Sequence, residues 1–113
     1  MFKLIFHPAA DKEYAEAMIW YEQQKPGLGK RFEISVDSII KKIQADPEFF
    51  GYFKKPFREA SVVLFPYTIV LKSIKESKLF ILLRFITPAE VLKRNIGIKE
   101  PPLFFNVKNS YFL

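Results

Sequence analysis

Apolar residues alternate with other residues at the start of the chain. Phe2, Leu4 and Phe6 recur at every second position, which is the period of a β-strand with one buried face. Pro8 follows, and proline suits the first turn of a helix because its missing N–H is not needed there. The pattern predicts a strand over 2–7 and a helix that begins at Pro8.

Two apolar stripes with helical spacing come next. The first stripe consists of Tyr14, Ala17, Met18 and Tyr21. The second stripe consists of Phe32, Val36, Ile39, Ile40 and Ile43. The sequence Lys-Pro-Gly-Leu-Gly at 25–29 separates them, and Asp46-Pro47 ends the second. We therefore expect a hairpin of two amphipathic helices, the first of which ends near Gln24.

The second half of the chain changes to the period of strands. Strands are predicted over Arg58–Phe65, Tyr67–Ile74 and Lys78–Ile86, with turns at Pro66 and at 75–77. Three strands with such short connections predict an antiparallel meander. Two helices packed on one face of this sheet give an α+β fold. We expect the first strand to lie at the edge of the sheet or beside the last strand.

The strand pattern ends at Ile86, so residues 1–86 are predicted to form the domain and 87–113 an atypical tail. Thr87-Pro88-Ala89-Glu90 has the spacing of a helix capping box. It predicts a short helix over 88–96, which Gly97 would end. The tandem prolines at 101–102 predict an irregular end.

The composition excludes several kinds of site. The chain has no cysteine and a single histidine, His7, which rules out a disulfide framework and a histidine metal site. We expect His7 to be a polar residue at a helix start, and we expect no metal and no cofactor. The longest apolar stretch, Val62–Leu71, contains Pro66 and is too short to span a membrane. A soluble, cytoplasmic protein without membrane contact is expected.

Charge is distributed unevenly along the chain. Residues 1–48 carry seven basic and eight acidic side chains, whereas 49–113 carry eleven and four. Basic and aromatic residues alternate in the second half: Tyr52, Lys54, Lys55, Arg58, Tyr67, Lys72 and Arg84. Such a surface can bind RNA, and its arginines and tyrosines could support metal-free cleavage by the 2′-hydroxyl. The alternative, which spacing alone favours, is a sheet face with core tyrosines and solvated lysines.

Several segments, taken in order, resemble one protein family. They are KLIFHPAA at 3–10, WYE at 20–22, PGLGKRF at 26–32, DP at 46–47, FREA at 57–60 and LFPYTI at 64–69. Together they resemble the RelE/ParE toxin superfamily, in particular its ParE-like plasmid stabilisation branch, over residues 1–86.

The resemblance implies a bacterial toxin of a type II toxin–antitoxin system. Its partner would be a cognate antitoxin that wraps the helices or the sheet, and its target DNA gyrase or the ribosome with its mRNA. By motif match, Arg58 and Tyr67 are the candidate catalytic residues, and Arg84 joins them if the chain is an endoribonuclease. An architectural role for Arg58 and the Phe-Pro-Tyr turn is the alternative. The oligomeric state, including a homodimer, stays open.

The ending of the last strand departs from the family pattern. The family has a histidine and, three positions later, an arginine, but here Ile86 and Ala89 stand there. A suitable choice of synonymous codons lets the neighbouring reading frame of 84–100 begin Phe-Tyr-His-Thr-Ser-Arg, which is the missing ending. We hypothesise that the sequence from about Arg84 onward is out of frame and that the toxin is inactive in this form. The competing interpretations are an in-frame divergent end, a ribosome-dependent mRNA endoribonuclease, and a non-catalytic remnant that binds antitoxin or nucleic acid.

Overall fold

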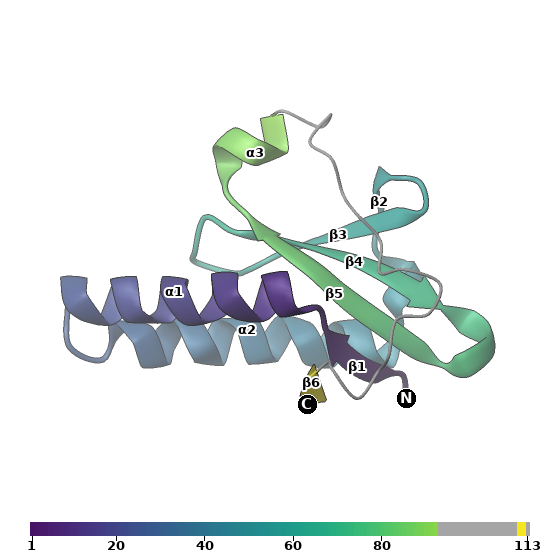
Figure 1. Ribbon diagram of the computed structural model, residues 1–113, viewed down its shortest axis with the longest axis horizontal. Coiled ribbons are helices and arrows are strands. Elements are labelled where there is room, and N and C mark those ends of the chain that lie inside the picture. Colours follow the sequence, from purple (N-terminus) through teal and green to yellow (C-terminus); the bar gives the residue numbers. More distant parts are fainter. Residues whose placement is uncertain (93–110, 113) are drawn as a thin grey trace.

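The computed structural model describes residues 1–92 and 111–112 of the chain (Figure 1). The helices are α1 (Pro8–Gln24), α2 (Leu28–Ala45) and α3 (Pro88–Leu92), with single 3₁₀ turns at Pro47–Phe49 and Lys75–Ser77. The strands are β1 (Lys3–Phe6), β2 (Tyr52–Lys54), β3 (Phe57–Ser61), β4 (Thr68–Ile74), β5 (Leu79–Ile86) and the two-residue β6 (Tyr111–Phe112). The predicted α+β class is confirmed.

The described strands form one mixed sheet in the order β2-β3-β4-β5-β1-β6. Strands β2 to β5 are antiparallel neighbours, whereas β1 lies parallel to β5 with Lys3 opposite Leu79. This order differs from the predicted three-stranded meander, because β2 adds a strand beyond β3. Strand β2 has only three residues and lies between Gly51 and Pro56. It is too short to show the alternation of apolar and polar residues by which a strand is predicted.

Strand β3 is shorter than predicted, because it ends at Ser61 rather than at Phe65. Leu64 has a φ of 70°, a left-handed conformation that a strand cannot contain. The Phe65-Pro66-Tyr67 turn closes with a 2.8 Å hydrogen bond from Tyr67 N to the carbonyl oxygen of Phe65. The turn therefore sends the chain back into β4 and leaves the aromatic side chains of Phe65 and Tyr67 beside the helices.

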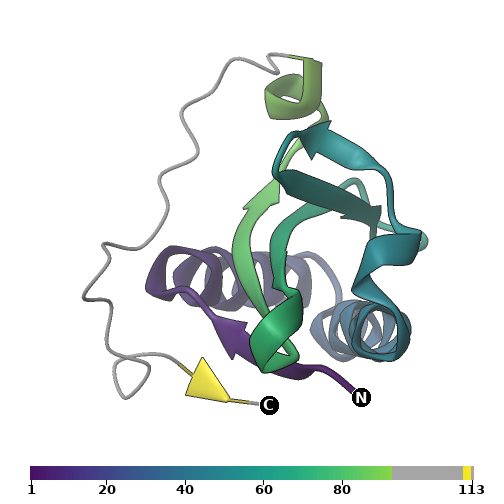
Figure 2. The ribbon, with the colours of Figure 1, turned by 90° about the vertical axis from the view of Figure 1, so that its right-hand side faces the viewer.

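The two long helices match the prediction and lie side by side on one side of the sheet (Figures 1 and 2). His7 caps α1, as predicted for a helix-start residue, since its Nδ1 accepts a hydrogen bond from Ala9 N at 3.1 Å. Gly27, with φ 88°, precedes α2. The carboxylate of Glu22 accepts hydrogen bonds from Gly27 N and Gly29 N, so it ties the end of α1 to the start of α2.

A hydrophobic core fills the space between these helices and the sheet. Every residue of the two predicted apolar stripes is buried there or packs against it. A second cluster belongs to the opposite face of the sheet and consists of Ile5, Phe53, Phe57, Val70, Ile81, Leu83 and Ile86. Strand β1 contributes Leu4 and Phe6 to the first cluster and Ile5 to the second, so both of its faces are buried.

Helix α3 begins at Pro88 and has the predicted capping box. Thr87 N donates to Glu90 Oε1 at 3.1 Å, and Glu90 N donates to Thr87 Oγ1 at 3.4 Å. The helix is described as far as Leu92; the rest of the predicted helix over 88–96, Gly97 and the prolines at 101–102 lie outside the described residues. Among the helices in the described part, none is long and apolar enough to cross a membrane.

Candidate functional site

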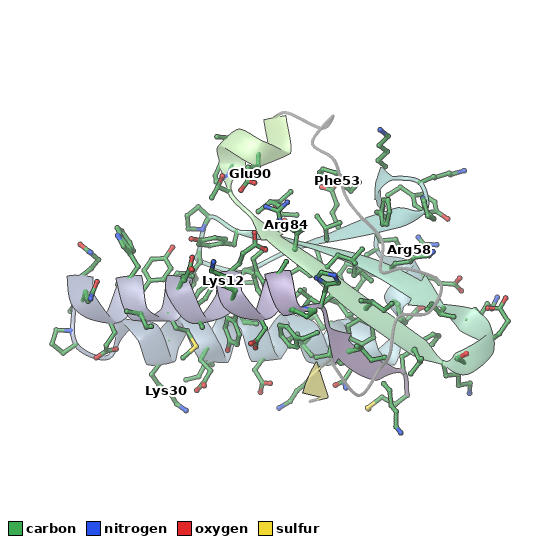
Figure 3. All side chains as sticks on the ribbon, in the orientation of Figure 1. Lys12, Lys30, Phe53, Arg58, Arg84 and Glu90 are labelled. Carbon is green, nitrogen blue, oxygen red and sulfur yellow. The ribbon has the colours of Figure 1, made fainter. Side chains whose placement is uncertain are left out.

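Three carboxylates and one guanidinium gather where β5 meets α3. Arg84 on β5 donates from Nε to Glu13 Oε2 at 2.8 Å and from Nη2 to Glu90 Oε2 at 2.9 Å. Figure 3 shows Arg84 and Glu90 together near this end of the sheet, while Arg58 lies toward the other end. Glu16, one turn after Glu13 on α1, lines the same region.

The position of Glu13 follows from the lengths of two strands. Strand β1 ends at Phe6, opposite Leu82, so the rest of β5 has no β1 neighbour. Glu13 of α1 supplies a partner there, because its Oε1 accepts a hydrogen bond from Phe85 N at 3.0 Å. One half-buried carboxylate thus satisfies both a strand N–H and the Arg84 side chain.

Glu90 is positioned by the capping box of α3. One of its carboxylate oxygens accepts from Thr87 N, and the other accepts from Arg84 Nη2. The first turn of α3 is therefore anchored to β5 through a side chain that also caps the helix.

A groove lies beside this network, between α1 and the junction of β5 with α3. It consists of two adjoining cavities of about 300 and 280 Å³, which share Trp20, Tyr67 and Thr87. The first is also lined by Glu13, Glu16, Ala17, Phe85 and Glu90. The second is also lined by Tyr21, Pro66 and Pro88. Trp20 is 55% exposed, so much of its indole surface borders open solvent.

Burial and the neighbouring charges shift the pKa values of several groups at this end of the sheet. Burial raises the pKa of Glu13 above its usual value, although its bonds to Phe85 N and Arg84 oppose this. Burial, followed by the charges of Glu13 and Glu90, raises the pKa of Tyr67. Burial lowers the pKa of Arg84, but the bonds and charges of the two glutamates outweigh it and raise the pKa overall. At neutral pH Tyr67 is therefore a phenol, and the positive charge of Arg84 is balanced by its partners.

Arg58 lies apart from this groove and binds the chain around β2. Its Nη1 donates to the carbonyl oxygen of Phe50 at 2.7 Å, and its Nη2 donates to the Tyr52 hydroxyl at 3.1 Å. The guanidinium carbon also lies 4.2 Å from the centre of the Tyr52 ring. These contacts support the architectural interpretation of Arg58, since they fasten the segment before β2 onto β3.

The structure thus divides the predicted site residues. Tyr67 and Arg84 belong to the same end of the sheet, whereas Arg58 forms a separate cluster with Tyr52 and Lys55, whose Nζ lies 5.1 Å from the Tyr52 ring. Their catalytic roles stay predictions. No group of three or more histidine, aspartate or glutamate side chains suited to a metal ion occurs within residues 1–92.

Sequence reasoning missed the acidic members of the groove. Glu13, Glu16, Ala17 and Trp20 recur at i, i+3, i+4 and i+7, so they share one face of α1 beside the core stripe. This periodicity could have identified the groove face. Glu13 and Glu90 are both bonded to Arg84 and largely shielded from solvent, which no local pattern in the sequence indicated.

Comparison of the sequence with protein-family models and with curated proteins found no match. The likeness to RelE/ParE toxins, seen in its motifs, therefore stays a prediction.

Proposed function

We propose that this protein is the toxin component of a type II toxin–antitoxin system, with a RelE/ParE-like arrangement of a helical hairpin on a mixed sheet whose strands β2 to β5 are antiparallel. One observation carries the proposal: two neighbouring motif segments of the helical hairpin and a third segment, much later in the sequence, meet in a single aromatic cluster. These are the segments at 20–22, 26–32 and 64–69.

The contacts within this cluster are specific. The ring centre of Tyr21 lies 5.2 Å from that of Phe32 and 4.9 Å from that of Phe65. Tyr67 completes the cluster at 5.6 Å from Phe32. Aromatic pairs at these separations stabilise a fold beyond the area that they bury. The residues that carry the resemblance are thus the ones that join helix hairpin and sheet, as expected if the resemblance reflects a shared architecture.

We further propose that the chain is inactive as a ribonuclease in this form. A toxin that cleaves RNA needs a cation available to the phosphate in the transition state. Arg84 is held by Glu13 and Glu90, and the neighbouring Glu16 adds another negative charge. A phosphate would be repelled from this end of the sheet unless these carboxylates moved.

Expression in a bacterial host under an inducible promoter tests the proposal. We expect the chain as it stands to leave growth unchanged. A version in which the residues after Leu83 are replaced by the Phe-Tyr-His-Thr-Ser-Arg ending should arrest growth, and a version with the same residues in scrambled order should not. Cleaved mRNA would then identify the ribosome as the target, and DNA breaks would identify gyrase.

Two outcomes contradict the proposal. Growth arrest by the unaltered chain would show that it is not inactive. A soluble, folded chain with the restored ending that leaves growth unchanged would remove the toxin assignment and favour a non-catalytic remnant. The codons of residues 84–100 separately test the frame hypothesis, because they either spell the family ending in the neighbouring frame or do not.

A further inference from the structure

We propose that the groove between α1 and the β5–α3 junction binds a polypeptide segment that presents an arginine side chain next to an apolar side chain. This proposal does not depend on the toxin assignment, because it rests on the shape and charge of the groove alone.

One wall of the groove is the part of α1 that borders its buried core stripe. Glu13, Glu16 and Trp20 project from successive turns, with Ala17 between them. Ala17 is only 4% exposed and forms a floor, whereas Trp20 is 55% exposed. A half-exposed tryptophan beside a cavity is a typical anchor for a binding partner, because covering it removes a large apolar area from water.

The two ends of the groove differ in chemistry. The end near Arg84 holds the carboxylates of Glu13, Glu16 and Glu90. The other end is lined by Tyr21, Pro66 and Pro88. Trp20, Tyr67 and Thr87 lie between the two. An occupant that matches both ends carries a positive charge followed by an apolar group.

The groove is negatively charged, whereas the chain as a whole has a net charge of +6. Three carboxylates line or border it against one guanidinium, Arg84. Glu16 is the carboxylate most open to a partner: its ion pair with Lys12 is 3.9 Å long, and the two side chains are 65% and 78% exposed. Such a pair is worth little in solution, so an incoming cation can replace Lys12.

Arginine suits this place better than lysine. Its planar guanidinium can lie against an aromatic ring while its N–H groups reach carboxylates, whereas an ammonium group is a compact and strongly hydrated charge. The two cavities, of about 300 and 280 Å³, are at the small end of ligand sites, which span about 300–1,000 Å³. Each is suited to one side chain, so a polypeptide that crosses the groove at Thr87 can fill both.

Trp20 offers a direct measurement, because it is the only tryptophan of the chain. The probe is the peptide acetyl-Gly-Arg-Leu-Gly-amide, titrated into the full chain while tryptophan fluorescence is recorded. Matched peptides replace arginine with citrulline, which keeps the shape but removes the charge, or leucine with glycine. A second peptide, with one residue between arginine and leucine, tests whether the two side chains fit the groove better when they are not adjacent in the sequence. We expect a saturable change with the arginine–leucine peptides and at least tenfold weaker binding of the citrulline and glycine forms.

Variants place the binding in the groove. Glu16→Gln should weaken the binding of the peptide about tenfold, whereas Glu33→Gln should leave it within twofold, because Glu33 is a partly exposed glutamate on α2 that pairs with Lys30 outside the groove. Calorimetry should show the same loss for Trp20→Ala but not for Ile19→Ala, an equally exposed apolar residue on α1. Circular dichroism verifies that each variant is folded.

Several results would overturn the proposal. The absence of saturable binding by either arginine–leucine peptide removes it. Equal binding of the citrulline peptide rules out charge recognition, and equal loss from Glu33→Gln rules out this location. If N-acetylarginine amide binds as tightly as the peptides, the site takes a small cation and the polypeptide partner is wrong.

Discussion

Arg84 and Glu13 are 71 positions apart in the chain, yet Nε of the arginine lies 2.8 Å from Oε2 of the glutamate. This bond joins α1 to β5 beyond the point where β1 ends. The same carboxylate also accepts a hydrogen bond from Phe85 N, so the side chain of Glu13 takes the place of a neighbouring strand there.

We predict that Glu13 and Arg84 are energetically coupled. Glu13→Gln should lower the free energy of unfolding by about 1–3 kcal/mol, because it leaves a half-buried guanidinium with fewer acceptors. Arg84→Met should cost a similar amount. Urea denaturation of both single variants and the double variant gives the coupling energy, which we expect to be about 0.5–2 kcal/mol.

Glu16→Gln is the matched control for this cycle, since its side chain is exposed and its effect should stay within about 0.5 kcal/mol. Additive effects of the Glu13 and Arg84 substitutions would show that the 2.8 Å contact does not stabilise the fold in solution.

A side chain at Gly29 should destabilise the packing of α1 against α2. A Cβ atom there would lie 2.8 Å from the backbone oxygen of Met18, so the helices would have to separate. We expect Gly29→Ala to lower the melting temperature and to cost about 1–3 kcal/mol. Gly51→Ala, where a Cβ meets nothing within 4 Å, should change stability by less than about 0.5 kcal/mol. Equal effects at the two glycines would show that close helix packing is not the cause.

Phe32 should be the most sensitive aromatic residue. It is fully buried and its ring lies near those of Tyr14, Tyr21, Phe65 and Tyr67. Phe32→Ala should cost about 3–5 kcal/mol, because it leaves a cavity in the centre of the core. Phe49→Ala removes the same side chain at a position that is 79% exposed, and it should cost less than about 1 kcal/mol. Denaturant unfolding of both variants compares the two losses directly.

The stability of the protein should fall at high pH in a way that depends on Tyr14. Burial, with smaller contributions from Glu33 and Asp37, raises the pKa of Tyr14 from 10.0 to about 12. Because the folded pKa is higher, this contribution is fully present below pH 10 and is lost as the pH rises toward 12. We expect a loss of about 1–2 kcal/mol after allowance for partial exposure.

Tyr14→Phe provides the test, since phenylalanine does not ionise. The free energy of unfolding of this variant should decrease less steeply between pH 10 and pH 12 than that of the unaltered protein. Parallel curves would show that Tyr14 ionises equally well in the folded and unfolded chains.

The sequence predicted the elements whose residues have a clear period. The stripe from Phe32 to Ile43 specified α2 and its buried face, and Pro8 marked the start of α1. The Thr87–Glu90 spacing likewise predicted a capping box, which both of its hydrogen bonds confirm. Each of these signals is local, so no knowledge of the tertiary fold was needed.

The misses depend on contacts between distant segments. Strand β2 has three residues, of which Phe53 alone is buried, and its partner is β3. Strand β3 is shortened by the left-handed conformation of Leu64, and the β propensity of this residue does not predict that conformation. The capping box predicted a local role for Glu90, but the sequence did not indicate that Glu13 and Glu90 share Arg84 as a partner, because only the folded chain brings these side chains together. The groove could be anticipated only from the α1 face that holds Trp20.

The place of β1 has a consequence for synthesis of the protein on the ribosome. Its parallel neighbour in the sheet is β5, with Lys3 opposite Leu79. At about 5–20 residues per second, the roughly 76 residues between these partners take about 4–15 s to translate. The first strand therefore leaves the ribosome long before its partner exists, and its apolar residues Leu4, Ile5 and Phe6 must wait unpaired. Strand β1 can therefore take its place in the sheet only after β5 has been synthesised, so this pairing cannot begin the folding of the chain during translation.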